Sequence, residues 1–127
     1  MTTIINLTQH QPTAEQVAAG VVNLRRDLLE SLNLCLNFEA QYAKEDLELS
    51  AKSIIALLFH NGSSGVGQRV MVGGMPSFMP ILEKTLLQAG FRVLYAKTDR
   101  ISEDQPQEDG TVRKISVFKH IGFYEAE

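Results

Sequence analysis

The chain has 127 residues, 44% of them hydrophobic and 21% charged, which suits one ordinary globular domain with a single core. Its formal charge of −3 excludes broad, sequence-independent binding to long nucleic acids, because such binding needs a basic face. The single cysteine, Cys35, excludes an internal disulfide and lies in an apolar stretch that favours a small buried hydrophobe over a nucleophile. With no signal-type N-terminus and no apolar run of bilayer length, we expect a cytoplasmic protein that has no membrane partner.

The N-terminal part predicts two short strands separated by a helix. An apolar run at 3–7 predicts a strand in the interior of a sheet, and the Thr-x-x-Gln pattern at 13–16 is that of a capping box, which begins a helix. Gly20 allows two interpretations: it ends a short helix before a strand at 21–24, or one helix continues through it from 13 to 34 at a cost of about 1 kcal/mol relative to alanine. We favour the break, because β-branched residues follow the glycine directly.

The next stretch predicts helical structure and a flexible connection. Residues 25–38 are ambiguous, whereas 39–60 carry an apolar stripe at helical spacing and predict a helix. The connection at 61–67 contains three glycines. It follows a helix and precedes a strand, the reverse of the order in phosphate-binding loops, so we interpret it as a plain linker.

Residues 70–96 predict a strand–turn–helix–strand unit around which the sheet is built. The apolar run at 70–72 ends at the Gly73-Gly74 pair, Pro76 suits the first turn of a helix, and Gly90 suits its left-handed C-terminal cap. The paired glycines allow a ligand to approach the backbone opposite a helix N-terminus, which favours anions. We expect any small-molecule site to lie at this turn.

The C-terminal part predicts a hairpin. The polar, acidic stretch 102–110 is typical of an exposed hairpin tip, and 111–124 predicts a strand that pairs antiparallel with the strand at 91–100. Apolar residues alternate onto both faces of this last strand, so we expect it to be at least partly covered on both sides. Taken together, the elements predict an α/β fold, a single-domain Rossmann-like three-layer sandwich over residues 1–127, with a mostly parallel sheet, helices on both faces and a C-terminal antiparallel hairpin strand.

Ligands of open parallel sheets bind beyond the carboxyl ends of the strands, which selects the candidate site residues. His10 is the candidate catalytic residue, as a general acid or base or a donor to phosphate; a loop histidine satisfied by the backbone is the equally compatible structural interpretation. Ser77 either contacts an anion or supplies its hydroxyl to the first turn of the helix. The residues expected to bind the ligand are Asn6, Thr8, Gly73, Gly74, Met75, Ser77, Lys97 and Arg100.

The sequence contains no spacing typical of metal ligands and no Gly-x-Ser-x-Gly, Walker or Gly-x-Gly-x-x-Gly motif. We therefore expect no metal and no cofactor, and the chain lacks the signatures of classical hydrolases, P-loop nucleotidases and dinucleotide-dependent oxidoreductases.

The apolar strand followed by Asn6-x-Thr8-x-His10-x-x-Thr13-x-Glu15-Gln16 resembles the opening of small stand-alone CRISPR-associated Rossmann-fold (CARF-like) proteins. The resemblance is confined to this N-terminal stretch. It implies a compact Rossmann-like homodimer that binds cyclic oligoadenylate at the carboxyl ends of its strands, and some relatives of that kind cleave the ring without a metal. The turn after residue 72 and the acidic stretch 102–110 have no counterpart in the resemblance.

Three functions follow as hypotheses. The first is a binding protein for a small phosphorylated or nucleotide-type anion. The second is a non-catalytic homodimeric interaction protein. The third is an enzyme in which His10 acts on the bound ligand while Lys97 or Arg100 stabilises negative charge. The first and third require that the His10 loop and the Gly73-Gly74 turn lie on the same rim of the sheet.

Overall fold

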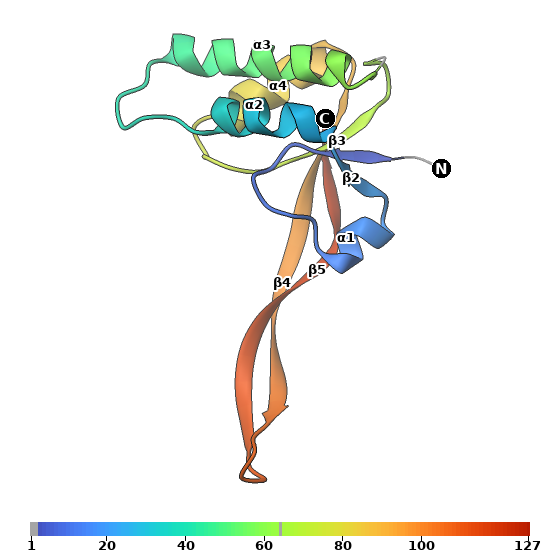
Figure 1. Ribbon diagram of the computed structural model, residues 1–127, viewed down its shortest axis with the longest axis vertical. Helices are drawn as coiled ribbons and strands as arrows, with labels where there is room; N and C mark the ends of the chain where they lie inside the picture. The colour runs from blue at the N-terminus through green and yellow to red at the C-terminus, as the bar shows by residue number, and fades with distance from the viewer. Residues whose placement is uncertain (1–2, 64) are drawn as a thin grey trace.

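The computed structural model describes residues 3–63 and 65–127, and Figure 1 shows a layered α/β body from which a long β-hairpin projects. The five strands have the spatial order β2-β1-β3-β4-β5. The first four pair in parallel and β5 pairs antiparallel with β4. The strands are β1 (Ile4–Asn6), β2 (Val21–Asn23), β3 (Arg69–Val72), β4 (Arg92–Pro106) and β5 (Val112–Ala126). The helices are α1 (Ala14–Ala18), α2 (Arg26–Leu36), α3 (Lys44–His60) and α4 (Met79–Gln88).

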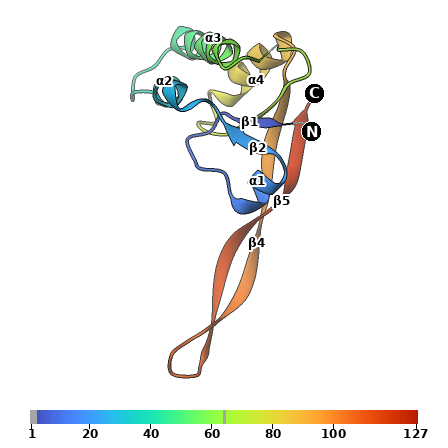
Figure 2. The same cartoon turned by 45° about the vertical axis from the view of Figure 1, so that its right-hand side comes forward.

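The helices lie on both faces of the sheet, in unequal layers. The chain steps from β1 to β2 in one direction along the sheet, and from β2 to β3 and β3 to β4 in the other. Right-handed crossovers then put α1 on one face and α2, α3 and α4 on the opposite face, as Figures 1 and 2 show. The expected Rossmann-like three-layer sandwich is confirmed, with a single short helix as its thin layer.

Alternate residues of the strands divide the core between these faces. Toward the three helices, strand residues pack on helical ones in one large buried cluster that includes Ile5, Leu7, Val70, Val72, Val93, Leu32, Ile54, Leu58, Phe78, Leu82 and Leu86. Toward α1, a smaller cluster consists of Ile4, Val21, Met71 and Leu94, with Phe123 packed against it. The near-continuous apolar runs of β1 and β3 reflect this two-sided burial.

The break at Gly20 is confirmed, and a single helix from 13 to 34 is wrong. Thr13 and Gln16 form the predicted capping box, with reciprocal bonds of 3.1 and 3.0 Å. Gly20 adopts a φ of 106°, and its carbonyl accepts a hydrogen bond from the Ile4 N–H (2.9 Å). Val21 then pairs with Ile4 in a parallel ladder that helical backbone cannot make. The ambiguous stretch 25–38 forms α2.

Two helices begin later than the sequence predicts. The predicted helix 39–60 begins at Lys44, because the Asp46 carboxylate accepts the Ala43 N–H (2.8 Å) and fixes the first turn there. Pro76 lies in an irregular turn before α4, and Pro80 occupies the first turn of that helix instead. The predicted cap at Gly90 is confirmed: its φ is 96°, and the Phe91 N–H bonds back to the Leu86 carbonyl (3.0 Å).

The linker at 61–67 connects α3 to β3 as predicted, and Ser64 within it lies outside the described residues. The hairpin differs from the prediction. Only residues 107–111 form its turn, where the Gln107 N–H bonds to the Thr111 carbonyl (2.8 Å), and 102–106 continue β4 as strand.

The partial cover expected on both faces of the last strand is present in its inner part, where Ala126 and Phe123 pack on the two core clusters, and does not extend to its outer part. The β3 ladder ends at the Val72–Tyr95 pair, so beyond it β4 and β5 form a two-stranded ribbon, and Val112 is 61% exposed. A register shift at Lys97/Thr98 also breaks the strict alternation of faces. His120 and Phe123 therefore share a face, with ring centroids 4.8 Å apart.

Replacement of Leu58 by alanine tests the burial of α3. Leu58 is fully buried, so Leu58→Ala is expected to lower the free energy of unfolding by about 2–5 kcal/mol in urea denaturation. Leu49, on the same helix but 66% exposed, is the matched control, and Leu49→Ala is expected to change stability by less than about 0.5 kcal/mol. Equal effects of the two substitutions would contradict the orientation of α3.

Candidate functional site

The candidate site lies where the direction of winding reverses, between β1 and β3. Ligands of open α/β sheets bind at such a switch point, beyond the carboxyl ends of the two strands. Here the loops that follow β1 and β3 meet: a Cβ built on Gly73 would be 3.4 Å from Thr8 Cγ2. The structure therefore brings the His10 loop and the double-glycine turn to one rim, as the sequence predicts.

A buried amide holds the first of these loops. Asn6 is 3% exposed, and its Nδ2 donates to the His10 carbonyl and to Asn23 Oδ1, both at 2.9 Å. Its Oδ1 accepts the backbone N–H of Thr8 (2.9 Å) and the Thr8 hydroxyl (2.7 Å). All four hydrogen-bonding positions of the amide are thus used within the protein. Asn6, predicted as a ligand contact, shapes the loop instead, and the Thr8 hydroxyl shares that task.

His10 stands exposed at the outer end of this loop. It borders two small cavities of about 300 and 320 Å³, which also include Gly73 in their walls. Within the described residues its imidazole makes no hydrogen bond, whereas its backbone carbonyl is bound by Asn6. The side chain is therefore accessible to a ligand, and the interpretation of His10 as a loop histidine satisfied by backbone contacts is not supported.

The turn after β3 offers backbone donors. The N–H groups of Phe78 and Met79 both bond to the Met75 carbonyl, at 2.9 and 3.2 Å. For the preceding N–H groups the described part of the chain supplies no acceptor; these are the N–H groups of Gly73, Gly74, Met75 and Ser77. Such donors at the start of a helix attract an anion. The Ser77 hydroxyl lies 2.8 Å from the Tyr42 hydroxyl, so it joins the turn to the loop before α3 instead of bonding to the first turn of α4.

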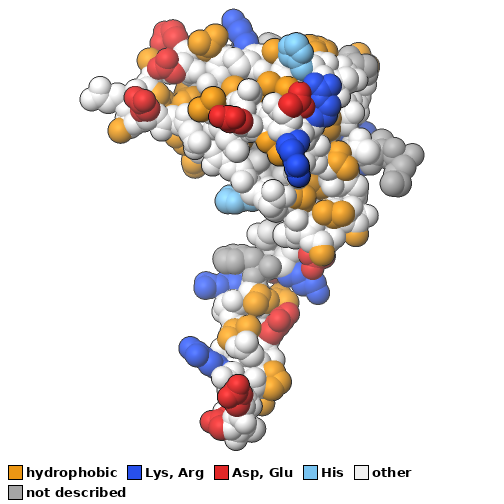
Figure 3. Space-filling model, viewed as in Figure 1, with side chains coloured by type: hydrophobic (Ala, Val, Ile, Leu, Met, Phe, Trp, Pro, Cys, Tyr) orange, Lys and Arg blue, Asp and Glu red, His pale blue; other side chains and the backbone are white. Residues whose placement is uncertain are grey.

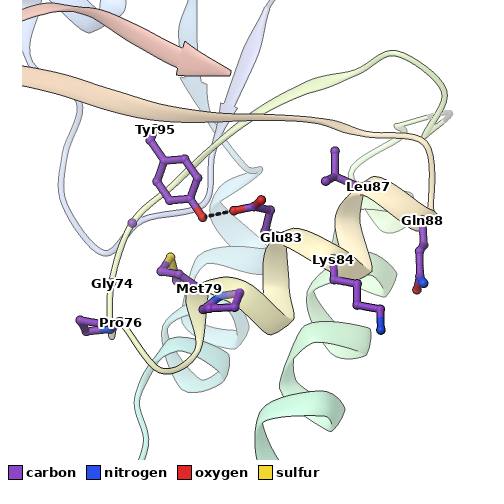
Figure 4. Close-up of a pocket in the computed structure, with 10 residues that line it drawn as sticks. Gly74, Pro76, Met79, Glu83, Lys84, Leu87, Gln88 and Tyr95 are labelled. Atoms are coloured by element: carbon purple, nitrogen blue, oxygen red, sulfur yellow. Dashed lines mark hydrogen bonds between the residues drawn. The ribbon is translucent and has the colours of Figure 1, made fainter. Parts of the chain in front are cut away.

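An open apolar groove of about 860 Å³ begins at the same two glycines and runs between α4 and β4. Figure 4 shows Tyr95 reaching from β4 to α4, where its hydroxyl donates to Glu83 Oε2 at 2.7 Å. Burial and the Glu83 carboxylate raise the pKa of Tyr95, so the phenol keeps its proton at a pH where an exposed tyrosine would ionise. This groove was not predicted from the sequence. The sequence feature that indicates it is a row of side chains spaced i, i+4 and i+8 on α4, namely Met79, Glu83 and Leu87. This row lies next to the side chains of α4 that pack in the core.

Two predicted cations lie elsewhere. Lys97 and Arg100 were expected at a strand end, but β4 continues to Pro106, so both belong to the projecting hairpin. Of the residues described, neither is in the walls of the cavities at the rim. The acidic composition of 102–110 predicted a loop there. Because an exposed ribbon tolerates charged residues, the strand extends further than this composition indicates.

The described side chains also bear on a reactive thiol, a metal site and a membrane-spanning helix. Burial raises the pKa of the half-buried Cys35 thiol, which disfavours the reactive thiolate. In the described ranges 3–63 and 65–127, no three His, Cys, Asp or Glu side chains are grouped as metal ligands. No helix of the described chain has both the length and the apolar character needed to cross a membrane.

Replacement of Asn6 tests its role in shaping the site. Asn6→Ala leaves the Thr8 and His10 backbone groups without their buried partner, so we expect a loss of about 1–3 kcal/mol in the free energy of unfolding. Urea denaturation measures this loss, with Asn33→Ala on the exposed side of α2 as the control. A stability unchanged from the wild type would show that the amide does not hold the loop.

Comparison with known proteins gives a match to a family model. The model of the Uncharacterized protein MJ1673 family matches residues 2–124, nearly the whole chain. No curated protein and no solved structure matches it.

Proposed function

The chain belongs to the Uncharacterized protein MJ1673 family, and we propose that it binds a small phosphorylated ligand of the nucleotide type at the carboxyl ends of β1 and β3. One observation carries the proposal: Gly73 and Gly74 border both the polar hollow beneath His10 and the apolar groove along α4. A ligand with an anionic end and a flat apolar end matches this pair of cavities. A bare phosphate would leave the groove unused.

The phosphate end of the ligand would lie at the turn after β3. The N–H groups without acceptors there, together with the dipole of the ten-residue α4, provide positive potential without a cationic side chain. The exposed imidazole of His10 supplies a further donor across the hollow. This arrangement explains how a chain of net charge −3 can attract an anion.

The base of the ligand would lie in the groove. Its volume is within the range typical of small-molecule sites, and apolar walls with a few polar groups suit a heterocycle. Met79, Pro80, Leu87 and Tyr95 supply apolar surface, while Glu83 and Gln88 offer polar atoms to the edge of a base. Cyclic oligoadenylate, which the N-terminal resemblance implies, is one member of this ligand class.

Binding rather than turnover is the function we propose. The enzyme hypothesis assigned charge stabilisation to Lys97 or Arg100, and both side chains are on the hairpin beyond the rim. His10 supplies a donor or an acid, and among the described residues no side chain is hydrogen-bonded to its imidazole as a partner for a reaction.

A thermal-shift panel tests the ligand class. We expect adenosine monophosphate or a cyclic oligoadenylate to raise the melting temperature more than adenosine or inorganic phosphate does at equal concentration, because only the nucleotides fill both cavities. At one hundred times Kd the stabilisation is about 2.7 kcal/mol, a shift of several degrees. A panel without any shift, or a shift with phosphate alone that the base does not improve, would refute a nucleotide site.

Substitution of His10 separates the site from the fold. His10 is exposed and its ring makes no bond within the described chain, so His10→Ala is expected to leave the melting temperature of the free protein unchanged. It is expected to weaken nucleotide binding about tenfold, the loss of one hydrogen bond to a charged group, measured by isothermal titration calorimetry. His60→Ala, at the exposed end of α3, is the control and should bind as the wild type does. Equal affinity of the two variants would exclude His10 from the site.

A further inference from the structure

The hairpin is the feature that the proposed ligand site does not explain. From Thr98 onward β4 pairs with β5 alone, since its ladder with β3 ends at Tyr95. We call residues 98–106 and 112–120 the arm. At about 3.3 Å per residue, its nine-residue strands reach roughly 30 Å, and Figures 1 and 2 show it standing clear of the helices.

A ribbon of two strands is marginally stable in water, and it needs a third strand or a packed face to be ordered independently. One face of the arm carries Ile101 opposite Val117, with Ile115 next to them. These side chains are half-buried by one another, and Figure 3 shows hydrophobic side chains at the surface of the arm among acidic and basic ones. The described body of the chain places no second layer on these side chains, so a partner that covers them would stabilise the arm.

The charges on that same face are sorted by strand. Asp99 and Glu103 lie on β4, whereas Arg113 and Lys119 lie on β5. No ion pair within 4.0 Å includes any of these four in the described part of the chain. Along β4 the apolar side chain is thus flanked by two acidic ones, which we call the acidic border, and along β5 the apolar side chains are flanked by two basic ones, the basic border.

We propose that the arms of two copies of this chain pack face to face, side by side and pointing the same way, about a twofold axis parallel to the arms. Rotation about this axis places β4 of each copy over β5 of the other. Asp99 of each copy then meets Lys119 of the other, and Ile101 meets Val117 in a shared apolar centre. Glu103 lies over Ile115, with Arg113 at the neighbouring diagonal position. A twofold axis across the arms would place acid over acid, and edge-to-edge pairing of β5 would bring Arg113, Lys114 and Lys119 of both copies together. Charge complementarity therefore selects both the occupant and its orientation.

This interface uses no residue of the ligand site, so it stands or fails independently of the proposed function. Sheets that pack face to face lie about 10 Å apart, which leaves the two hairpin turns adjacent at the far end. In the antiparallel alternative, the turns lie at opposite ends of the interface, separated by the length of the arm.

Light scattering coupled to gel filtration of the full chain tests the dimer. We expect a mass of twice 14.1 kDa for the wild type and of 14.1 kDa for Ile101→Lys. Ser102 is the next residue along β4 and its side chain lies on the opposite face of the arm, so Ser102→Lys adds the same charge away from the interface and is expected to remain dimeric. A monomeric wild type, or a dimeric Ile101→Lys, would overturn the proposal, and dissociation by both lysine variants would place the contact on a different surface.

Charge reversal gives a milder variant if Ile101→Lys fails to fold. Asp99→Lys is expected to weaken the dimer at least tenfold, and Asp99→Lys combined with Lys119→Asp to restore it, in sedimentation equilibrium at low salt. Equal dimerisation of the single variant and the wild type would exclude the paired borders.

A cross-link tests the orientation. In a Cys35→Ala background, Glu108→Cys places one thiol at the exposed turn of each arm. A bismaleimide that spans about 10 Å is expected to join the parallel arms into a covalent dimer, while Glu45→Cys at the start of α3 stays unlinked. Failure of the Glu108→Cys dimer to cross-link would rule out arms that point the same way.

Discussion

The amide of Asn6 is the interaction on which the rim of this sheet depends. A buried amide in a low-dielectric interior is costly unless each of its donors and acceptors is satisfied, and here the satisfying groups come from two neighbouring segments, the following loop and β2. The chain after β1 therefore curls back over its own strand end. That curl puts the His10 backbone within reach of Asn6 and leaves the imidazole outside, facing the turn after β3. The Asn6 side chain thus bonds to the neighbouring strand β2 and at the same time fixes the loop that forms one wall of the hollow.

The second constraint is the mismatch in strand length. β3 has four residues and ends at Val72, where the double glycine turns the chain away, whereas β4 has fifteen. The first part of β4 is shared with the body and carries Tyr95 to the groove; the remainder has one neighbour only. The register shift at Lys97/Thr98 lies at this boundary and allows the ribbon to twist independently of the parallel sheet. The same strand therefore serves the cavity at one end and an unpartnered surface at the other.

Local signals in the sequence predicted those parts of the fold that local chemistry determines. The capping box at Thr13, the positive φ of Gly20 and the cap at Gly90 each involve residues within a few positions of one another, and all three are confirmed. The meeting of the His10 loop with Gly73 followed from topology, since parallel strand ends share one edge. Contacts between distant segments were not predictable in this way: the Ser77 hydroxyl finds Tyr42, 35 residues away, and Asn6 finds Asn23. Nothing in the sequence around Ser77 or Asn6 distinguishes a side chain that bonds within the protein from one that is free to bind a ligand.

The arm shows why composition misled at the C-terminal end. Acidic residues, a proline and Asp-Gly in 102–110 are typical of a turn, because in most sheets charged side chains are excluded from covered strands. In a ribbon with both edges free, that exclusion does not operate, so residues 102–106 remain strand despite four polar or charged side chains before the proline. What strand pairing requires is a partner in register, and β5 supplies one to the last residue of β4. The apolar positions of β5 suggested cover on both faces, but among the described residues of the arm those side chains are covered only by one another. A second layer packed on the arm would cover its apolar side chains and so stabilise the ribbon. Because the acidic and basic side chains of that face lie on different strands, the layer must present the opposite charge to each strand.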